Sequence, residues 1–215
     1  MVAAWPLFDL SITTPRLSLR LPSDRELMTL AEQGATGLLS EEQAGFMSGW
    51  ALLPSPQFER SLVRYHWRLR GSWSQASWSL ALGIYPVGEH DPVGGIDATA
   101  TEFARSRSVS TGWWLLPAWR GRGLGKEALA AMLHLVFDGL QALEARQIVH
   151  PENEVSLAIS RALGYELDGT ERTIAGDGQA IDAVRLVLHR DHWRRRRRSN
   201  IDLRGLDSCS DLFGL

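Results

Sequence analysis

The sequence predicts a mixed α/β fold, in which one mixed sheet carries helices on both of its faces. Strand-like alternation and helical spacing follow one another irregularly: a strand and helices, a meander of strands, then strand, helix, strand, helix and two strands. That order does not fit a repeated strand–helix–strand array. With 44% hydrophobic and 22% charged residues, the 215-residue chain is long enough to fold as one domain without disulfides.

The first third of the chain predicts one strand and two helices. Residues 14–20 alternate polar and apolar side chains, which is typical of a strand. A Ser-Asp pair follows and predicts the start of a helix over residues 25–33. Residues 34–56 are rich in Gly, Ser and Pro, so we expect a loop with a short helix. Residues 57–69 show apolar side chains at helical spacing.

The rest of the chain predicts a strand meander, followed by strands that alternate with helices. The longest helix carries apolar residues on most of its sides, so we expect it to be covered by the sheet. A glycine, Gly164, is expected to end the next helix. The predicted strands are residues 78–85, 93–101, 109–116, 147–150, 165–173 and 180–189, and the predicted helices are residues 126–143 and 153–163.

The charges are unevenly distributed and divide the chain into two parts. Residues 194–215 carry six arginines and three aspartates, so residues 1–193 hold the rest of a formal net charge of −2 and are acidic. We therefore expect one domain over residues 1–193 and an Arg-rich C-terminal extension over residues 194–215. An acidic body argues against a broad nucleic-acid footprint. The run at residues 194–198 leaves two readings open, a solvated extension or a contact with RNA or another anionic surface.

The chain shows no secretory signal and no apolar run long enough to span a membrane, so we expect a cytoplasmic protein. The lone cysteine, Cys209, excludes an intramolecular disulfide and is read as an incidental residue. No histidine pairs with a carboxylate or cysteine at metal-ligand spacing, so no metal site is expected.

The most informative stretch is the glycine-rich turn at residues 120–125, between a predicted strand and a helix. Such a turn presents unpaired backbone N–H groups at the positive end of a helix dipole, and glycines let a ligand approach closely. This predicts a site for a phosphate or pyrophosphate. A P-loop is excluded because Arg120 and Glu127 replace its glycine and its Ser or Thr, and a dinucleotide fingerprint is excluded by Lys126.

Arg120, Gly123 and Gly125 form the pattern Arg-x-x-Gly-x-Gly, which resembles the coenzyme A signature of the GNAT acyltransferases. Residues 14–20, Pro-Glu-Asn-Glu-Val-Ser at 151–156 and Arg-Ala-Leu-Gly-Tyr-Glu at 161–166 look like the branch that resembles ribosomal-protein N-terminal acetyltransferases. The resemblance covers residues 12–193 and is weakest at 34–76. It implies a twisted, largely antiparallel sheet of roughly seven strands, with a splayed central strand pair that binds coenzyme A.

The resemblance also assigns the donor site. Backbone groups of the last strand residues before the turn would pair with the pantetheine arm, and the turn itself would hold the pyrophosphate. Asn153 would contact the pantetheine arm, with a helix N-cap as its alternative role. Ser156 would donate to the departing thiolate as the catalytic acid or hydrogen-bond donor, or be a helix-start residue only. The donor-site residues expected in this way are Trp114, Leu115, Leu116, Arg120, Gly121, Arg122, Gly123, Leu124, Gly125, Lys126, Asn153 and Ser156.

The general base is where the sequence departs from the family pattern. Many relatives carry a glutamate two residues before the glycine of the preceding strand, and here that position is Ser110. Serine cannot accept the proton of an amine at neutral pH. Asp97, Glu102 and Glu152 are the nearest acidic candidates, and the sequence does not choose among them. Ser160 stands where other branches carry a tyrosine acid.

The resemblance implies an acyl-CoA-dependent N-acyltransferase that moves the acyl group to a primary amine by direct attack in a ternary complex. We expect acetyl-CoA as the donor, with succinyl-CoA as an alternative, and a small molecule, a protein N-terminus or a lysine as the acceptor. Four tryptophans within residues 50–78 suit an aromatic wall on the acceptor side or core packing. A non-catalytic acyl-CoA-binding or regulatory module is the alternative function, and a homo-oligomer stays open.

Overall fold

The computed structural model describes residues 4–40, 43, 45–47, 49–196 and 200–215. In this part of the chain, nine strands form one sheet in the order β7-β8-β6-β5-β4-β3-β2-β1-β9. β5 and β6 run parallel, and the other neighbouring strands described by their register run antiparallel. The strands are β1 Ser11–Thr13, β2 Leu17–Arg20, β3 Ser77–Pro86, β4 Gly94–Thr101, β5 Ser108–Leu115, β6 Glu144–Val149, β7 Glu166–Ile174, β8 Ala180–His189 and β9 Asp202–Arg204.

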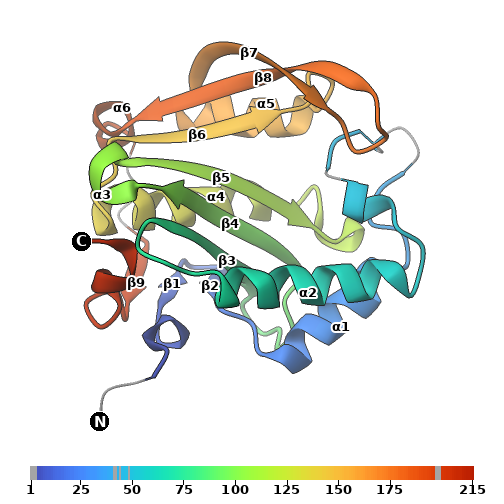
Figure 1. Cartoon of the computed structure of the whole chain (residues 1–215), viewed down its shortest axis with the longest axis horizontal. Coiled ribbons are helices and arrows are strands. Elements are labelled where there is room, and N and C mark those ends of the chain that lie inside the picture. Colours follow the sequence, from blue (N-terminus) through green and yellow to red (C-terminus); the bar gives the residue numbers. More distant parts are fainter. Residues whose placement is uncertain (1–3, 41–42, 44, 48, 197–199) are drawn as a thin grey trace.

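Helices pack on both faces of the sheet, as the sequence predicts (Figure 1). α1 and α2 enclose a small apolar cluster with Leu116 on one face, and α4 lies in the main core on the other face. The helices are α1 Asp24–Gly34, α2 Gln57–Gly71, α3 Phe103–Ser106, α4 Leu124–His134, α5 Glu154–Leu163 and α6 Arg190–Arg194, with shorter 3-10 turns at Pro6–Phe8, Gly49–Leu52, Pro117–Trp119 and Ser210–Phe213.

Helix ends follow their local chemistry closely. Ser23 caps α1 in a reciprocal capping box with Glu26, in which the serine hydroxyl accepts from the Glu26 N–H. Asn153 caps α5, and Gly164 ends that helix in the left-handed conformation, with φ = 100°. Both helices therefore begin and end within a residue or two of the predicted positions.

The long helix predicted over residues 126–143 is wrong in its second half. α4 ends at His134 and continues as a π-helical turn over Leu135–Gly139, where the Leu140 N–H donates to the Leu135 carbonyl over 2.8 Å. Gln141 then adopts φ = 58°, which turns the chain toward β6. The apolar pattern runs through this region because the turn is as deeply buried as the helix, so periodicity alone could not locate the helix end.

The sheet has two strands more than the seven expected, both short and both at one edge. β1 precedes the predicted first strand, and β9 pairs with β1 through Leu203 opposite Ile12. Beyond β9 the chain continues into the main core, where Phe213 is fully buried against Trp73 and Trp78. Residues 200–215 thus pack on their own chain. Arg197 and Arg198 of the basic run lie outside the described residues.

Candidate active site

A cavity of about 680 Å³ opens where β5 and β6 separate. The two parallel strands are paired from Ser108 to Ser110, opposite Glu144 to Arg146, and β5 then continues to Leu115 with β4 on its other side. The second half of β5 therefore keeps one edge without a neighbouring strand. That edge, the glycine-rich turn, the end of β6 and the first half of α5 line the cavity. The splayed strand pair that the family resemblance implies is present.

The glycine-rich turn presents the N-terminus of α4 to this cavity. Gly123 is the N-cap of α4, with φ = 76°, and no side chain caps the helix. The first N–H groups of the helix therefore lack intrahelical acceptors, and the helix dipole adds positive potential. A Cβ on Gly125 would come within 2.5 Å of the Trp113 ring, so this glycine lets the helix lie directly against β5. The turn has the properties of a phosphate site.

Three residues that the sequence reading missed hold this turn in place. Arg16 donates through Nε to Glu127 over 2.7 Å and through a terminal nitrogen to the Arg122 carbonyl over 3.0 Å. Thr14 donates to the other oxygen of Glu127 over 2.6 Å. Burial alone would raise the pKa of Glu127, but the hydrogen bonds from Thr14 and Arg16 lower it. Glu127 therefore stays ionised, and its charge is compensated before an anionic ligand arrives.

Nine of the twelve predicted donor-site residues line the cavity, and three do not. The three are Leu116, which packs in the apolar cluster of α1 and α2, Arg122, whose guanidinium lies 4.9 Å from the Trp119 ring centre, and Lys126. The nine are Trp114, Leu115, Arg120, Gly121, Gly123, Leu124, Gly125, Asn153 and Ser156.

Arg120 has its guanidinium bound to the protein itself. Nε donates to the Leu115 carbonyl over 2.9 Å, and the two terminal nitrogens donate to the Leu38 carbonyl over 2.6 Å and to Gln43 over 3.2 Å. The side chain thus ties the loop after α1 to the end of β5. The Arg120 guanidinium is therefore already hydrogen-bonded within the protein, and its role in the site is to hold the turn in position.

Asn153 and Ser156 lie together at the start of α5. Asn153 Oδ1 accepts from the Ser156 backbone N–H over 3.1 Å, which is the N-cap role considered for it. The carbonyl oxygen is used in the cap, and the amide NH₂ group donates to no residue that the structure describes. The Ser156 hydroxyl likewise has no partner among the described residues, and Ser156 lines the cavity.

A buried hydrogen-bonded chain crosses the base of the splay. Ser160 donates to Gln147 Oε1 over 2.5 Å, Gln147 donates to Thr111 over 3.2 Å, and the Thr111 hydroxyl meets the Tyr165 hydroxyl at 3.2 Å. Burial raises the pKa of Tyr165, so its hydroxyl stays protonated. Because the hydrogen of the Ser160 hydroxyl is used inside this chain, Ser160 does not provide the acid that other branches place there.

Asp97 lies at the apex of the splay. It pairs with Gly112 across β4 and β5, and a Cβ on Gly112 would lie 3.1 Å from the carboxylate, so the glycine leaves room for it. Gly112 lines the cavity two residues beyond the last β5–β6 pair. The side chain keeps some solvent contact, but protein surrounds it, and this desolvation raises the pKa of Asp97 to about 7.

The other two acidic candidates are placed less favourably for proton transfer. Glu102 is exposed at the tight turn after β4, five residues and about 16 Å of extended strand from Asp97. Glu152 lines the cavity but is exposed. Among the residues that the structure describes, no group of three or more His, Cys, Asp or Glu side chains could hold a metal ion. No helix in the same residues is long and apolar enough to cross a membrane.

The acetyltransferase (GNAT) domain family matches residues 16–166, which include the turn, the splay and the start of α5. This chain belongs to the GNAT acetyltransferase family. Membership makes it an acyltransferase with acetyl-CoA or another acyl-CoA as its co-substrate. The predictions of family, fold class, enzyme class and co-substrate are therefore confirmed.

Solved structures support the same fold. Mycobacterium smegmatis RimJ in complex with CoA-disulfide superposes with a TM-score of 0.71 at 19% identity, over 98% of this chain and 97% of that one. The ribosomal-protein-S5-alanine acetyltransferase from Vibrio fischeri gives a TM-score of 0.66 at 17% identity, over 86% and 99%. The microcin C7 self-immunity acetyltransferase MccE, in complex with acetyl-CoA and AMP, gives 0.64 at 15% identity, over 81% and 93%.

Proposed function

We propose that the protein transfers an acetyl group from acetyl-CoA to a primary amine by direct attack within a ternary complex. The observation that carries this proposal is the placement of the Asp97 carboxylate beside Gly112, at the apex of the β5–β6 splay. An unpaired strand edge and a helix end with the properties of a phosphate site line one cavity, and the desolvated Asp97 carboxylate lies on the neighbouring strand, opposite Gly112.

Acetyl-CoA would bind along the length of the cavity. The turn at residues 121–125 would receive the pyrophosphate through backbone N–H groups at the start of α4. The pantetheine arm would extend the open edge of β5, with the Asn153 amide as a donor from the other side. The thioester would then lie near Gly112, with Ser156 on one side and Asp97 on the other.

The reaction requires a general base for the amine and a hydrogen-bond donor for the departing thiolate. The amine nitrogen attacks the thioester carbonyl carbon, a C–N bond forms, and the C–S bond then breaks. Asp97 takes the proton that the amine loses, which suits a carboxylate whose pKa lies near neutrality. The Ser156 hydroxyl donates a hydrogen bond to the departing thiolate. Positioning the two substrates contributes the remainder of the rate enhancement.

The lining of the cavity favours acetyl over succinyl as the acyl group. A succinyl carboxylate would need a free cationic partner near the thioester. Among the described residues that line the cavity, Arg120 is the only Arg or Lys, and carbonyl groups already satisfy its guanidinium. Burying a second, unpaired carboxylate near Asp97 would be costly.

A thermal-shift titration tests donor binding first, with coenzyme A, acetyl-CoA and succinyl-CoA, and with NAD and ATP as controls. Release of coenzyme A is then measured with a panel of amines, which should begin with protein N-termini because structural relatives are named as ribosomal-protein acetyltransferases. Stabilisation by acetyl-CoA without turnover on any amine would favour the non-catalytic binding module instead. Absence of any shift with coenzyme A species would remove the donor site itself.

A further inference from the structure

Three arginines form a row along the exposed side of α2. Arg60, Arg64 and Arg68 are four residues apart, so they share one face of the helix, and all three are exposed. Arg60 and Arg64 form no hydrogen bond or ion pair across the fold with a described residue. Arg70 on the same helix differs, because it pairs with Asp24 over 3.1 Å and donates to the Pro22 carbonyl.

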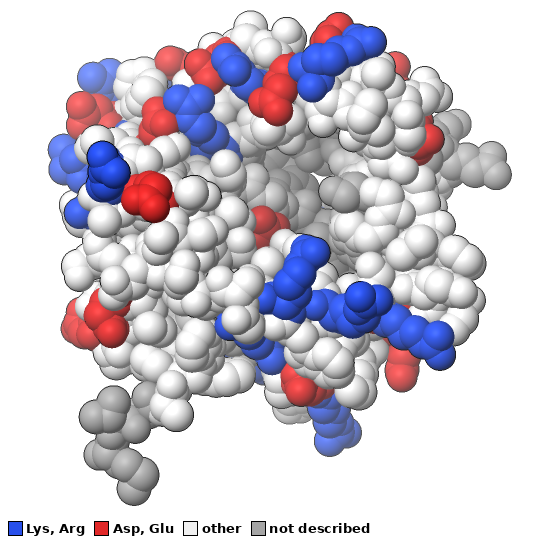
Figure 2. All heavy atoms as spheres, in the orientation of Figure 1, with Lys and Arg blue, Asp and Glu red and all other residues white. Residues whose placement is uncertain are grey.

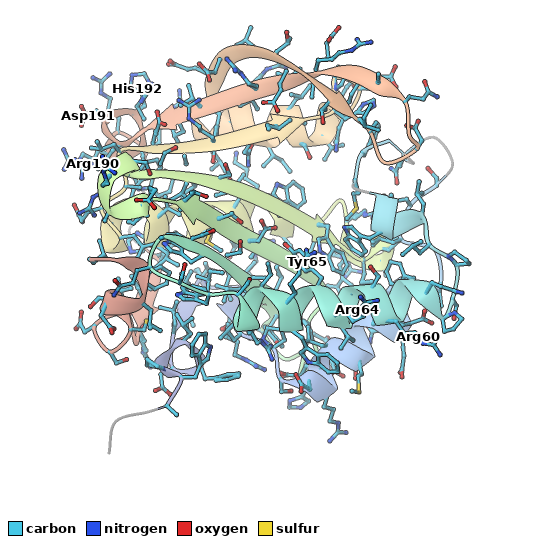
Figure 3. All side chains as sticks on the ribbon, viewed as in Figure 1. Arg60, Arg64, Tyr65, Arg190, Asp191 and His192 are labelled. Atoms are coloured by element: carbon cyan, nitrogen blue, oxygen red, sulfur yellow. The ribbon has the colours of Figure 1, made fainter. Side chains whose placement is uncertain are left out.

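The row runs along the border of the candidate active site. Figure 2 shows basic side chains in a band over α2, at one margin of the hollow in the middle of this face. Figure 3 shows Arg60 and Arg64 following one another along α2, with Tyr65 at the border between the helix and the strands. The Arg68 guanidinium lies 5.7 Å from the centre of the Tyr65 ring. Burial, and next the nearby Asp97 carboxylate, raises the pKa of Tyr65, so Tyr65, which Arg68 contacts, lies near Asp97.

The charge of the row is unbalanced within the described chain. Like charges four residues apart weakly destabilise a helix, so a partner that supplies negative charge would relieve the repulsion along the row. The row also contrasts with a chain whose formal net charge is −2. From Arg60 to Arg68 the helix rises about 12 Å. A small amine would reach one arginine of the row, whereas three or four residues of extended polypeptide would reach all of them.

We infer that the acceptor is a polypeptide with Asp or Glu residues close to its reacting amine, and that these carboxylates lie along Arg60, Arg64 and Arg68 while the amine reaches Asp97. This inference rests on the proposed N-acetyltransfer and adds the class of acceptor. Tyr65 would separate the arginine row from the base and contact the backbone between the amine and the first carboxylate.

The test uses three peptides that share an N-terminal alanine and differ in the next four residues, which are acidic, neutral or basic. Binding of labelled peptides to the full chain is measured by anisotropy with coenzyme A present, and kcat/KM is measured by release of coenzyme A from acetyl-CoA. We expect the acidic peptide to bind best. Arg64→Glu should weaken binding of the acidic peptide about tenfold. An exposed ion pair changes affinity by up to about fivefold, and reversing the charge of residue 64 adds repulsion.

Arg105→Glu is the matched control, because Arg105 is also an exposed helical arginine but lies on α3, next to the far end of β4. This control should leave the peptide order unchanged, and 1 M salt should shrink the preference in the wild type. Equal binding of all three peptides, or an acidic preference that survives Arg64→Glu, would overturn the inference. So would Arg64-dependent binding of single-stranded RNA in place of the acidic peptide, or free glutamate that is acetylated as well as the acidic peptide.

Failure of this inference can be distinguished from failure of the proposed function. If coenzyme A is released from acetyl-CoA with none of the acceptors while acetyl-CoA still stabilises the protein, the proposed N-acetyltransfer fails, whichever peptide binds best. If turnover occurs with the neutral peptide at the same kcat/KM as with the acidic one, the function stands and the arginine row has no part in choosing the acceptor.

Discussion

Asp97→Asn tests whether Asp97 acts as the general base. If it does, the substitution should lower activity and, at the same time, raise the stability of the folded protein. The folded protein raises the pKa of Asp97 to about 7, against 3.8 for an ordinary aspartate. At pH values between these two pKa values, the Asp97 carboxyl is mostly protonated in the folded state and mostly ionised in the unfolded state. The wild type therefore loses stability from this residue as pH rises from about 4 to about 7, and above about 7 the full cost is present.

That cost amounts to ~4 kcal/mol, since each pKa unit corresponds to about 1.36 kcal/mol. Asparagine keeps the size and polarity of aspartate without the charge. We expect Asp97→Asn to be more stable than the wild type at pH 8, with a Tm higher by roughly 10 °C for a domain of this size. The advantage should shrink toward pH 4 and vanish below the unfolded pKa of 3.8, where aspartate is protonated in both states. Urea or thermal unfolding at several pH values measures the difference between the two proteins.

Activity should change in the other direction. Loss of a general base lowers the rate by about 10²- to 10⁴-fold. In the wild type, log kcat/KM should rise with pH and level off near pH 7, and the part of this rise that comes from Asp97 should be missing in the variant. Steady-state release of coenzyme A with one peptide acceptor between pH 5.5 and 8.5 gives both profiles, and comparing them cancels the titration of the amine itself.

Glu102→Gln and Glu152→Gln serve as matched controls, because each removes one carboxylate of the three that the sequence offers as base. Both should keep the wild-type profile. The reasoning is refuted if Asp97→Asn retains near wild-type turnover at pH 8, or if Glu152→Gln loses the activity instead. A variant that is less stable than the wild type at pH 8 would show that the Asp97 carboxylate is held by interactions that outweigh its desolvation.

Further changes test the donor site and the packing of the C-terminal segment. Ser156→Ala should lower kcat about 10- to 150-fold with little change in the KM of acetyl-CoA, because a hydrogen bond to a charged leaving group is worth ~1.5–3 kcal/mol; an unchanged kcat would remove Ser156 from the chemistry. Gly123→Val should abolish thermal stabilisation by acetyl-CoA while circular dichroism stays the same, since valine cannot adopt φ = 76° cheaply, and a retained shift would place the pyrophosphate elsewhere. Phe213→Ala should lower the free energy of unfolding by about 3–5 kcal/mol in urea, because it empties a fully buried site against Trp78; a loss below ~1 kcal/mol would mean that this segment docks only loosely.

Local chemistry predicted those parts of the fold and site that depend on neighbouring residues. The limits of α5 follow from Asn153 and Gly164, which act on groups within a few residues of themselves. The glycine-rich turn, which is expected to bind phosphate, follows in the same way from its glycines and from the helix that starts there. The splay itself was expected only through the family resemblance, since the separation of two strands is not a local property.

Long-range pairing decides the remaining features, and no short pattern reports it. Three acidic residues were equivalent in the sequence until the β4–β5 register placed Asp97 opposite Gly112. Arg120 was expected to face an anion, but the loop after α1 returns over 77 residues to bring Gln43 to its guanidinium. β9 is three residues long, and its partner β1 lies near the other end of the chain.

The arginines of this chain therefore differ in role according to what already satisfies them. Arg16 and Arg120 donate hydrogen bonds to carbonyl and carboxylate oxygens of the protein. These bonds fix the glycine-rich turn and the end of β5 relative to their neighbours. If the turn binds the pyrophosphate as proposed, it does so through backbone N–H groups, which carry no mobile side chain and lose little entropy on binding. On α2, by contrast, Arg60 and Arg64 are exposed and follow one another along the helix. If the acceptor brings negative charge, these exposed arginines are where it would find its partners, and Asp97 would accept the proton of its amine.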